Sequence, residues 1–206
     1  MKDVMVTRKT TESLMQIKLG FEGLAPDYRA KIDTGITFLN HMIEHIAWRS
    51  GVNVETTVKL DRFALSHVVC EDLGITLGKA VAKAVEDGLN DGVPGYGYAI
   101  GIIDEAKADA AISFESRALF DFTSVVDIPH DTEGMNSEDL ETFLEGFAQG
   151  AQCTLHVDIQ KGRNGHHIWE AVFRAVGIAL GMALSPDPAR KGRTSGVAGT
   201  VEFTVK

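Results

Sequence analysis

The sequence of 206 residues contains little cysteine, which excludes a fold held together by a disulfide framework. Only Cys70 and Cys153 are present, and they form no CxxC pair of the kind used in metal or redox sites. We therefore interpret both as reduced thiols buried in the core. Proline is also scarce, and no proline- or serine-rich linker divides the chain.

A net positive charge and long apolar runs are lacking as well. The formal net charge is −9 and there is no run of Lys or Arg, which argues against a nucleic-acid-binding surface. No stretch approaches the roughly 18 unbroken apolar residues of a membrane span. The N-terminus, MKDVMVTRKTTES, lacks the apolar core of a secretory signal, so we expect a cytoplasmic protein.

The chain instead contains two similar halves. The segment TFLNHMIEHIA, which begins at Thr37, is echoed by TFLEGFAQGA, which begins at Thr142. HVVCEDLGITLGKAVAKAV, from His67, resembles HHIWEAVFRAVGIALGMAL, from His166. Both pairs are separated by about half of the chain, which indicates a duplicated unit. We expect a single domain over residues 1–206, made of two pseudo-symmetric halves of about 1–92 and 93–206.

Hydrophobic periodicity predicts a mixed fold. Small and apolar residues recur at helical spacing over residues 37–48, 69–87, 138–150 and 167–184. Alternating apolar residues predict strands in six segments, which are MQIKLGF, VNVETTVKL, DAAISFES, DFTSVVDI, CTLHVDIQ and the C-terminal TVEFTVK. Two helices per half with strands outside them indicate an α+β fold, in which helices pack on mostly antiparallel sheets.

Histidine and glutamate recur together at the spacing of one helical turn. His67 and Glu71 are four residues apart, and His166 and Glu170 repeat this spacing with His167 between them. Such pairs share one helix face, and imidazole with carboxylate suits Mn²⁺, Fe²⁺ or Zn²⁺. One HxxxE pair is weak evidence, because solvated helix faces carry it often. Two copies at matching positions of a duplicated chain favour a metal site.

Other polar residues admit two interpretations each. His41 and His45 form a further four-residue pair, but we interpret His45 as an exposed helix residue. His156 falls on the strand face opposite the apolar residues around it, so it need not belong to the core. Glu12, before the first predicted strand, is either a solvated carboxylate or a functional one. Arg117, between two predicted strands, is either a phosphate contact or a turn charge.

Taken together, the motifs resemble those of the imidazoleglycerol-phosphate dehydratase family over nearly the whole chain. RKTTES is similar to that family's R-x-T-x-E-T opening, and IDTGITFLNHM to its I-x-T-G-I-x-F-L-D-H-M segment. HVVCEDLGITLGKA is similar to H-H-T-x-E-D-x-G-I-x-L-G, and IDEAKADAAISFESR to the D-E-A…S-G-R region. TLHV with GRNGHHIWEAVFRA matches T-L-H…G-x-N-x-H-H-x-x-E-A-x-F-K-A. The chain is therefore identified as a divergent member of this family.

The resemblance implies a ribosomal protein S5 domain 2-like fold, with four-stranded sheets in both halves. It implies trimers that assemble into a shell of up to 24 subunits, with active sites between subunits and one or two Mn²⁺ ions in each, Fe²⁺ or Zn²⁺ being the alternatives. Glu12 and Arg117 would contact the substrate, and Glu12, His41 and Glu170 would transfer protons. The implied metal set is His41, His67, Glu71, His156, His166, His167 and Glu170.

The metal motif of the first half departs from the family pattern. Where the family has H-H-x-x-E, this chain has Val68 after the first histidine, so one metal site lacks an imidazole. His45 or Cys70, each close in sequence to a predicted ligand, could replace it. The aspartate of the D-H-M segment is Asn40.

The family's phosphate contacts are also eroded. Its P-S-[ST]-K-G segment aligns with residues 195–199, which lack the matching serine and lysine. A second arginine, expected before Gly134, aligns with Thr132 and Glu133, although Lys191 and Arg193 lie near in the sequence. Because a charged hydrogen bond contributes about 1.5–3 kcal/mol, losing several would weaken phosphate binding roughly 10³-fold or more.

Three functions therefore remain open from the sequence. The first is the metal-dependent hydro-lyase reaction of the family, water elimination from imidazole glycerol phosphate in histidine biosynthesis. The second is a divergent paralogue that acts on another azole or polyol substrate. The third is a non-catalytic, metal-binding shell protein that keeps only the fold and the assembly.

Overall fold

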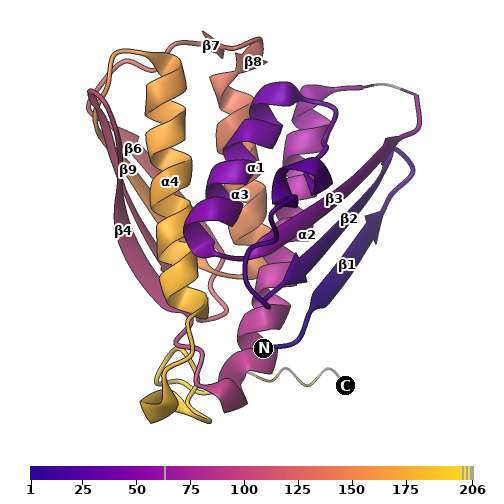
Figure 1. Ribbon diagram of the computed structural model, residues 1–206, viewed down its shortest axis with the longest axis vertical. Coiled ribbons are helices and arrows are strands. Elements are labelled where there is room, and N and C mark those ends of the chain that lie inside the picture. The colour runs from indigo at the N-terminus through magenta and orange to yellow at the C-terminus, as the bar shows by residue number, and fades with distance from the viewer. Residues whose placement is uncertain (63, 201, 203, 205–206) are drawn as a thin grey trace.

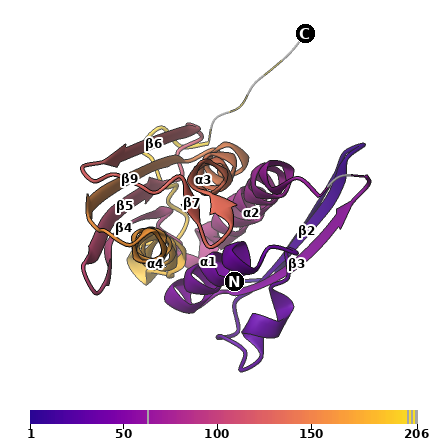
Figure 2. The ribbon, with the colours of Figure 1, turned by 90° about the horizontal axis from the view of Figure 1, so that it is seen from above.

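The computed structural model describes residues 1–62, 64–200, 202 and 204, and within them four helices lie between two β-sheets (Figure 1). The first sheet consists of β1 (Val4–Lys9), β2 (Ser13–Gly20) and β3 (Asn53–Leu60), in that order and antiparallel. The view from above shows the two sheets on opposite sides of the helices (Figure 2). The molecule is thus a sandwich with a helical centre.

The second sheet has the order β4 (Tyr96–Ile103), β5 (Ala106–Ser113), β9 (Thr154–Lys161) and β6 (Leu119–Ser124). It is antiparallel except for β6, which runs parallel to β9. A small hairpin of β7 (Asp131–Thr132) and β8 (Met135–Asn136) follows β6. Three short 3₁₀ helices complete the described elements, namely η1 (Tyr28–Lys31), η2 (Gly88–Asp91) and η3 (Pro188–Arg190).

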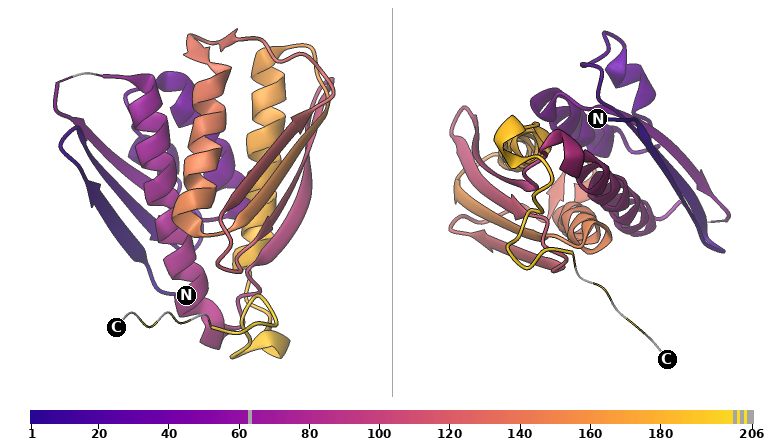
Figure 3. Two further views of the ribbon diagram at one scale, coloured as in Figure 1. Left: turned by 180° about the vertical axis from the view of Figure 1, so that it is seen from behind. Right: turned by 90° about the horizontal axis from the view of Figure 1, so that it is seen from below.

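The helices are α1 (Thr37–Ser50), α2 (Ser66–Asp87), α3 (Ser137–Ala151) and α4 (Gly165–Leu184). They pack as two pairs, α1 with α4 and α2 with α3. The view from behind shows α2 and α3 side by side, with α4 against the second sheet (Figure 3). Figure 1 shows α2, α3 and α4 beginning at the same end of the molecule, so polar residues of their first turns gather there.

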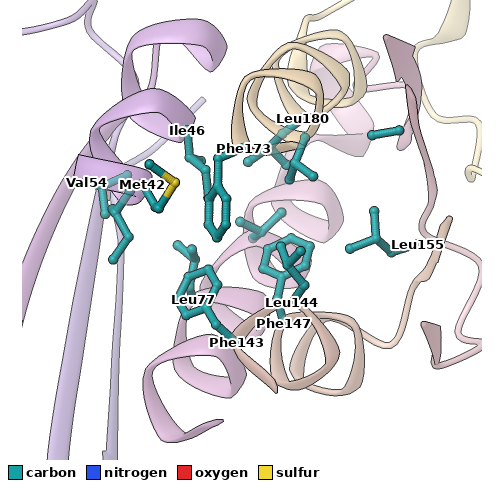
Figure 4. Packing of buried hydrophobic residues seen from close by; sticks show 14 of the residues in the cluster. Met42, Ile46, Val54, Leu77, Phe143, Leu144, Phe147, Leu155, Phe173 and Leu180 are labelled. Carbon is teal, nitrogen blue, oxygen red and sulfur yellow. The ribbon is translucent and has the colours of Figure 1, made fainter. Parts of the chain in front are cut away.

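Apolar side chains from all four helices and both sheets form one core. Phe143, Phe147 and Phe173 lie at its centre, between Leu77 on α2 and the second sheet (Figure 4). Helix α4 is apolar and long enough to cross a membrane, but 72% of its most apolar window is buried inside the fold. Packing against α1, β4 and β5 therefore accounts for its hydrophobicity.

The predicted fold class, helices on mostly antiparallel sheets, is confirmed, and the four predicted helices match within three residues at each end. The first sheet has three strands in the described residues instead of the four expected. Where the second half forms β6, the first half has an irregular segment with η1. TVEFTVK, predicted as a strand, falls largely outside the described residues.

Strands β1 and β4 were not expected from the sequence. In β4 the inward positions include Gly97 and Gly101, and a Cβ atom at Gly101 would lie 2.6 Å from the backbone nitrogen of Ala175 on α4. The apolar side chains Tyr98 and Ile100 point outward instead and are more than half exposed. The usual pattern of a half-buried strand, with large apolar side chains inward, is therefore reversed in β4. The inward glycines let α4 approach the sheet closely.

Candidate metal centre

The starts of α1 and α4 bring three of the predicted metal residues together. Potential ligand atoms of His41, His166 and Glu170 all lie within 4.8 Å of one another. Glu170 Oε2 is 3.4 Å from His166 Nε2 and 4.0 Å from His41 Nε2. The first turn of α4 is fixed by Asn164, whose side chain accepts a hydrogen bond of 2.9 Å from the backbone N–H of His166. We call His41, His166 and Glu170 the metal cluster.

The carboxylate of Glu170 is buried, with 5% of the residue exposed, and its two oxygens have different partners. The Arg174 guanidinium donates a hydrogen bond to Oε1, and a second Arg174 nitrogen donates to the carbonyl oxygen of Ile102 at 2.8 Å. Oε2 faces the two imidazoles of the metal cluster. Arg174 thus compensates the buried charge and leaves one oxygen directed toward a ligand.

His45 also belongs to this neighbourhood, so its interpretation as an exposed helix residue is wrong. Only 15% of its side chain is exposed, and its Nε2 lies 3.1 Å from Glu170 Oε1 and 3.4 Å from His41 Nε2. Burial lowers the pKa of His45 to about 4, so the imidazole is neutral near pH 7. The residue lies inside because α4 packs against this face of α1, which a pattern within α1 alone cannot reveal.

Two further carboxylates contact the metal cluster from outside. Glu44 Oε2 lies 3.6 Å from His41 Nδ1 and 3.3 Å from Nε of Arg29. Glu133, in the turn of the β7–β8 hairpin, is within hydrogen-bond distance of His166 Nδ1, at 3.1 Å. A carboxylate beside Nδ1 favours the tautomer with its proton on that atom and leaves Nε2 free to bind a metal.

His167 points away from the metal cluster and pairs with Glu105, 2.8 Å from its Nδ1. The same carboxylate accepts backbone hydrogen bonds from Arg163 and Asn164. The hydrogen bond from His167, followed by those backbone bonds, lowers the pKa of Glu105 to about 2. The hydrogen bond to Glu105 in turn raises the pKa of His167.

Three predicted metal residues lie elsewhere in the chain. His67 Nδ1 is 3.6 Å from the carboxylate of Asp139, at the junction of α2 and α3, and Glu71 is exposed on α2. His156 projects from the outer face of β9, 3.0 Å from Asp121. One chain therefore assembles three of the seven residues into a cluster, while the other four face other surroundings.

The residues expected to contact the substrate are also apart from the metal cluster. Glu12 is exposed in the turn between β1 and β2, so a strand precedes it. Arg117 and Ser195 line a cavity of about 430 Å³, and Glu86 and Glu115 line the same cavity. Cys70 is fully buried, and burial raises the pKa of its thiol, so it is a core residue.

The sequence interpretation missed Arg174, Glu44 and Glu105. Arg174 and Glu44 follow cluster residues by four and three positions, so helical spacing could have indicated them. Glu105 lies in the tight turn between β4 and β5, where no periodic pattern reports which side chain it will meet.

The fold and the metal cluster define a class of protein, an α+β sandwich whose central helices present imidazole and carboxylate donors at one end. The family model described as imidazoleglycerol-phosphate dehydratase matches residues 34–180. The enzyme of that name from Laribacter hongkongensis is 37% identical over 202 residues, covering 98% of this chain and 99% of that protein. The enzyme from Thioalkalivibrio sulfidiphilus is 36% identical over 197 residues, 95% and 96% of the two chains.

Solved structures of enzymes with this name are similar to the chain over most of its length. The imidazoleglycerol-phosphate dehydratase of Pyrococcus furiosus has a TM-score of 0.76 at 28% identity, covering 95% of this chain and 99% of that one. The enzyme of Staphylococcus aureus has a TM-score of 0.74 at 26% identity, covering 89% and 99%. The chain belongs to the imidazoleglycerol-phosphate dehydratase family, and its relatives are dehydratases, that is, hydro-lyases.

Proposed function

We propose that this protein is a metal-dependent hydro-lyase that removes water from imidazole glycerol phosphate in histidine biosynthesis. The observation that carries the proposal is the metal cluster, with donor atoms of His41, His166 and Glu170 within 4.8 Å, in a chain of this family. The relatives that match nearly the whole chain are named for this reaction.

The donor set fits a divalent transition metal, because neutral imidazole nitrogens and a carboxylate oxygen suit Mn²⁺, with Fe²⁺ or Zn²⁺ as alternatives. His41, His166 and Glu170 would hold the ion. When bound, it would supply Lewis acidity and orient the azole ring of the substrate.

The reaction requires removal of a proton from carbon and departure of the adjacent hydroxyl as water, which gives an enol that becomes a ketone. Glu12, His41 and Glu170 are the proton-transfer candidates that the resemblance implies, since general acid–base catalysis needs a group within hydrogen-bond reach of the substrate. Of the three, Glu12 is not also a proposed ligand of the ion, so we propose it as the proton-transfer group of the metal-loaded site. Arg174 limits Glu170 to one free oxygen, Oε2. Glu12 and Arg117 would contact the substrate.

Complete active sites would form between subunits. His67, Glu71, His156 and His167 do not join the metal cluster within one chain, so we propose that they serve the metal sites of assembled subunits. The assembly would be a homo-oligomer based on trimers, up to 24 subunits, of single-domain chains with halves 1–92 and 93–206, located in the cytoplasm. The observation that favours assembly is the exposed apolar outer face of β4, with Tyr98, Ile100 and Ile102.

A second candidate function is hydro-lyase chemistry on an azole or polyol that lacks phosphate. Two observations favour it. Glu133, at the place of an expected phosphate-binding arginine, has its carboxylate beside His166. Glu86 and Glu115 line the cavity around Arg117, where negative charge opposes an anion.

A dehydratase assay with added Mn²⁺, run beside metal analysis of the purified protein, tests the proposal. We expect imidazole glycerol phosphate to lose water, the activity to disappear on chelation, and the gene to rescue a histidine auxotroph. Tight metal binding without turnover of this substrate would favour the second candidate. Assembly that persists without metal, with neither turnover nor a response to any ligand, would leave the shell-protein interpretation.

A further inference from the structure

Each candidate metal histidine has a carboxylate beside the same ring nitrogen, Nδ1. The five pairs are His41 with Glu44, His67 with Asp139, His156 with Asp121, His166 with Glu133 and His167 with Glu105. Their separations lie between 2.8 and 3.6 Å. His45, which is not in the predicted metal set, differs, because the carboxylate of Glu170 lies 3.1 Å from its Nε2. The pattern thus extends to His67 and His156, which lie apart from the metal cluster.

We propose that Asp139 and Asp121 are positioning residues, which hold His67 and His156 in the tautomer that carries its proton on Nδ1 and leaves Nε2 to bind a metal ion. The inference rests on the proposed metal dependence and adds two residues that no sequence motif indicated. A ligating histidine usually donates its other ring N–H to a carboxylate, which fixes the tautomer and the orientation of the ring. Both imidazoles are exposed, so they are accessible to an ion held by a neighbouring subunit.

Asp139 is buried at the junction of α2 and α3, with only 6% of the residue exposed. Its Oδ1 lies 3.6 Å from Nδ1 of His67, slightly farther than a hydrogen bond, and a small rotation of the exposed ring closes the gap. The hydroxyl of Ser66 donates a hydrogen bond to Oδ2 and fixes the carboxylate. The first turn of α3, which contains Asp139, stabilises a negative charge. A carboxylate buried and fixed in this way differs from the exchangeable ion pairs of a protein surface.

The strand register places Asp121 beside His156. Strand β6 runs parallel to β9 with Asp121 directly opposite His156, and Asp121 Oδ2 lies 3.0 Å from His156 Nδ1. The pairing continues on both sides of this position, from Leu119 with Thr154 to Ser124 with Ile159. The contact is therefore set by the backbone of the sheet and not by a flexible loop.

A fixed tautomer favours metal binding. A neutral imidazole can carry its proton on either nitrogen, and a ring protonated on Nε2 has to transfer that proton before Nε2 can ligate. A carboxylate at Nδ1 removes this cost, makes the ligand more basic and adds negative charge near a dication. Loss of such a carboxylate typically weakens metal binding about 10–100-fold.

Manganese titrations of the full-length, metal-stripped protein test the role of Asp139. Mn²⁺ is titrated by calorimetry into wild type, Asp139→Asn, Asp139→Leu and, as a matched control, Glu138→Gln, which alters the neighbouring exposed carboxylate. We expect Asp139→Leu to bind Mn²⁺ roughly 10–100-fold more weakly than wild type. Asp139→Asn should be intermediate, because its amide oxygen still accepts a hydrogen bond from Nδ1. Glu138→Gln should bind as wild type does.

Asp121 is tested in the same way. Asp121→Leu should also lose roughly 10–100-fold in Mn²⁺ affinity, with Asp121→Asn intermediate. Asp109→Leu is the matched control, because Asp109 projects from the outer face of β5 in the same sheet and pairs with Lys107. Its Mn²⁺ affinity should equal that of wild type.

The tautomers are measured on metal-free wild type, without any variant. Nitrogen-15 NMR of the histidines at about pH 8.5, above the usual imidazole pKa, shows which ring nitrogen carries the proton. We expect the proton on Nδ1 in His67 and His156. His130, an exposed histidine outside the five pairs, should show the preference of a free imidazole for the proton on Nε2.

A proton on Nε2 of either histidine, or wild-type Mn²⁺ affinity in the corresponding Leu variant, would overturn the positioning role of that aspartate and leave the metal dependence intact. Failure of wild type to bind Mn²⁺ would instead refute the metal dependence itself. Circular dichroism and sedimentation check the folding and assembly of each variant. If a Leu variant does not fold, the Asn variant and the tautomer measurement decide.

Discussion

At the scale of single residues, the adjacent histidines of α4 have separate environments. His166 faces the metal cluster and Glu133, whereas His167 faces Glu105 in the turn between β4 and β5. Successive helix positions differ by about 100° in direction, so two adjacent side chains cannot point at the same neighbour. The two adjacent histidines therefore make separate contacts, and only His166 joins the metal cluster within one chain.

The ion pair between His167 and Glu105 makes the titration of His167 predictable. Replacing Glu105 by Gln removes the negative charge, so the pKa of His167 should fall toward its ordinary value of 6.5. Because the folded pKa is raised, the pair stabilises the fold below pH 6.5, and this contribution is lost as the pH rises through the folded value. NMR titration of metal-free wild type and Glu105→Gln measures the shift.

Glu133→Gln provides the matched control for that titration. This substitution removes an equivalent charge beside His166, and it should leave the pKa of His167 nearly unchanged. Equal titration curves of His167 in wild type and Glu105→Gln would show that the contact does not persist in solution.

At the scale of elements, sequence periodicity predicted the helices well and the strands less completely. The helix patterns extend over many residues and repeat in both halves, so duplication reinforced them. The sequence did not predict β4, because Gly97 and Gly101 occupy the inward positions where apolar side chains were sought. Glycine is needed there because α4, which is distant in the sequence, approaches the strand closely. The fourth strand of the first sheet was expected from the family resemblance alone, because no alternating apolar pattern predicts a strand between β2 and α1, where the second half has β6.

The close packing of α2 against α3 depends on glycine. A Cβ atom at Gly78 would overlap the carbonyl oxygen of Phe147 and lie 2.7 Å from the backbone nitrogen of Ala151. Gly78→Ala gains about 1 kcal/mol of helix propensity, but it forces two backbones apart. Overpacking costs typically 1–3 kcal/mol and more against rigid backbone. We expect a net loss of roughly 1–2 kcal/mol in the free energy of unfolding, measured by urea denaturation.

Lys83→Ala in the same helix is the control for Gly78→Ala. Lys83 is exposed and pairs with Asp87 at the surface, so its removal should change stability by less than about 1 kcal/mol. A Gly78→Ala variant as stable as wild type would contradict this prediction. It would mean that α2 and α3 can move apart without any loss in the free energy of unfolding.

At the scale of the whole molecule, the sequence proposed candidate metal residues but did not show where their side chains meet. Residue types and spacing indicated His41, His166 and Glu170, and the structure brings these three together. No pattern within one helix could show that His45 is covered by α4, because this depends on how two helices pack. The roles of His67 and His156 are implied by resemblance alone, and in a single chain both residues lie apart from the metal cluster.

Subunit mixing tests whether His156 acts on the metal cluster of another chain. We expect Glu170→Ala and His156→Ala each to be nearly inactive in the dehydratase assay, because each breaks every site of a uniform assembly. When the two variants are dissociated and reassembled together in equal amounts, about one quarter of the sites should combine two intact contributions. The mixed sample should therefore recover up to roughly a quarter of wild-type activity, provided that subunits exchange randomly.

Mixing Glu170→Ala with His166→Ala supplies the decisive comparison. Both substitutions lie in the metal cluster, to which α1 and α4 of one chain contribute together, so every cluster in that mixture carries one defect. This sample should recover no activity, although its subunits exchange in the same way. Recovery in the first mixture alone locates His156 in the site of a neighbouring subunit. Equal behaviour of the two mixtures would mean that the site is completed within one chain, and that His156 has another function.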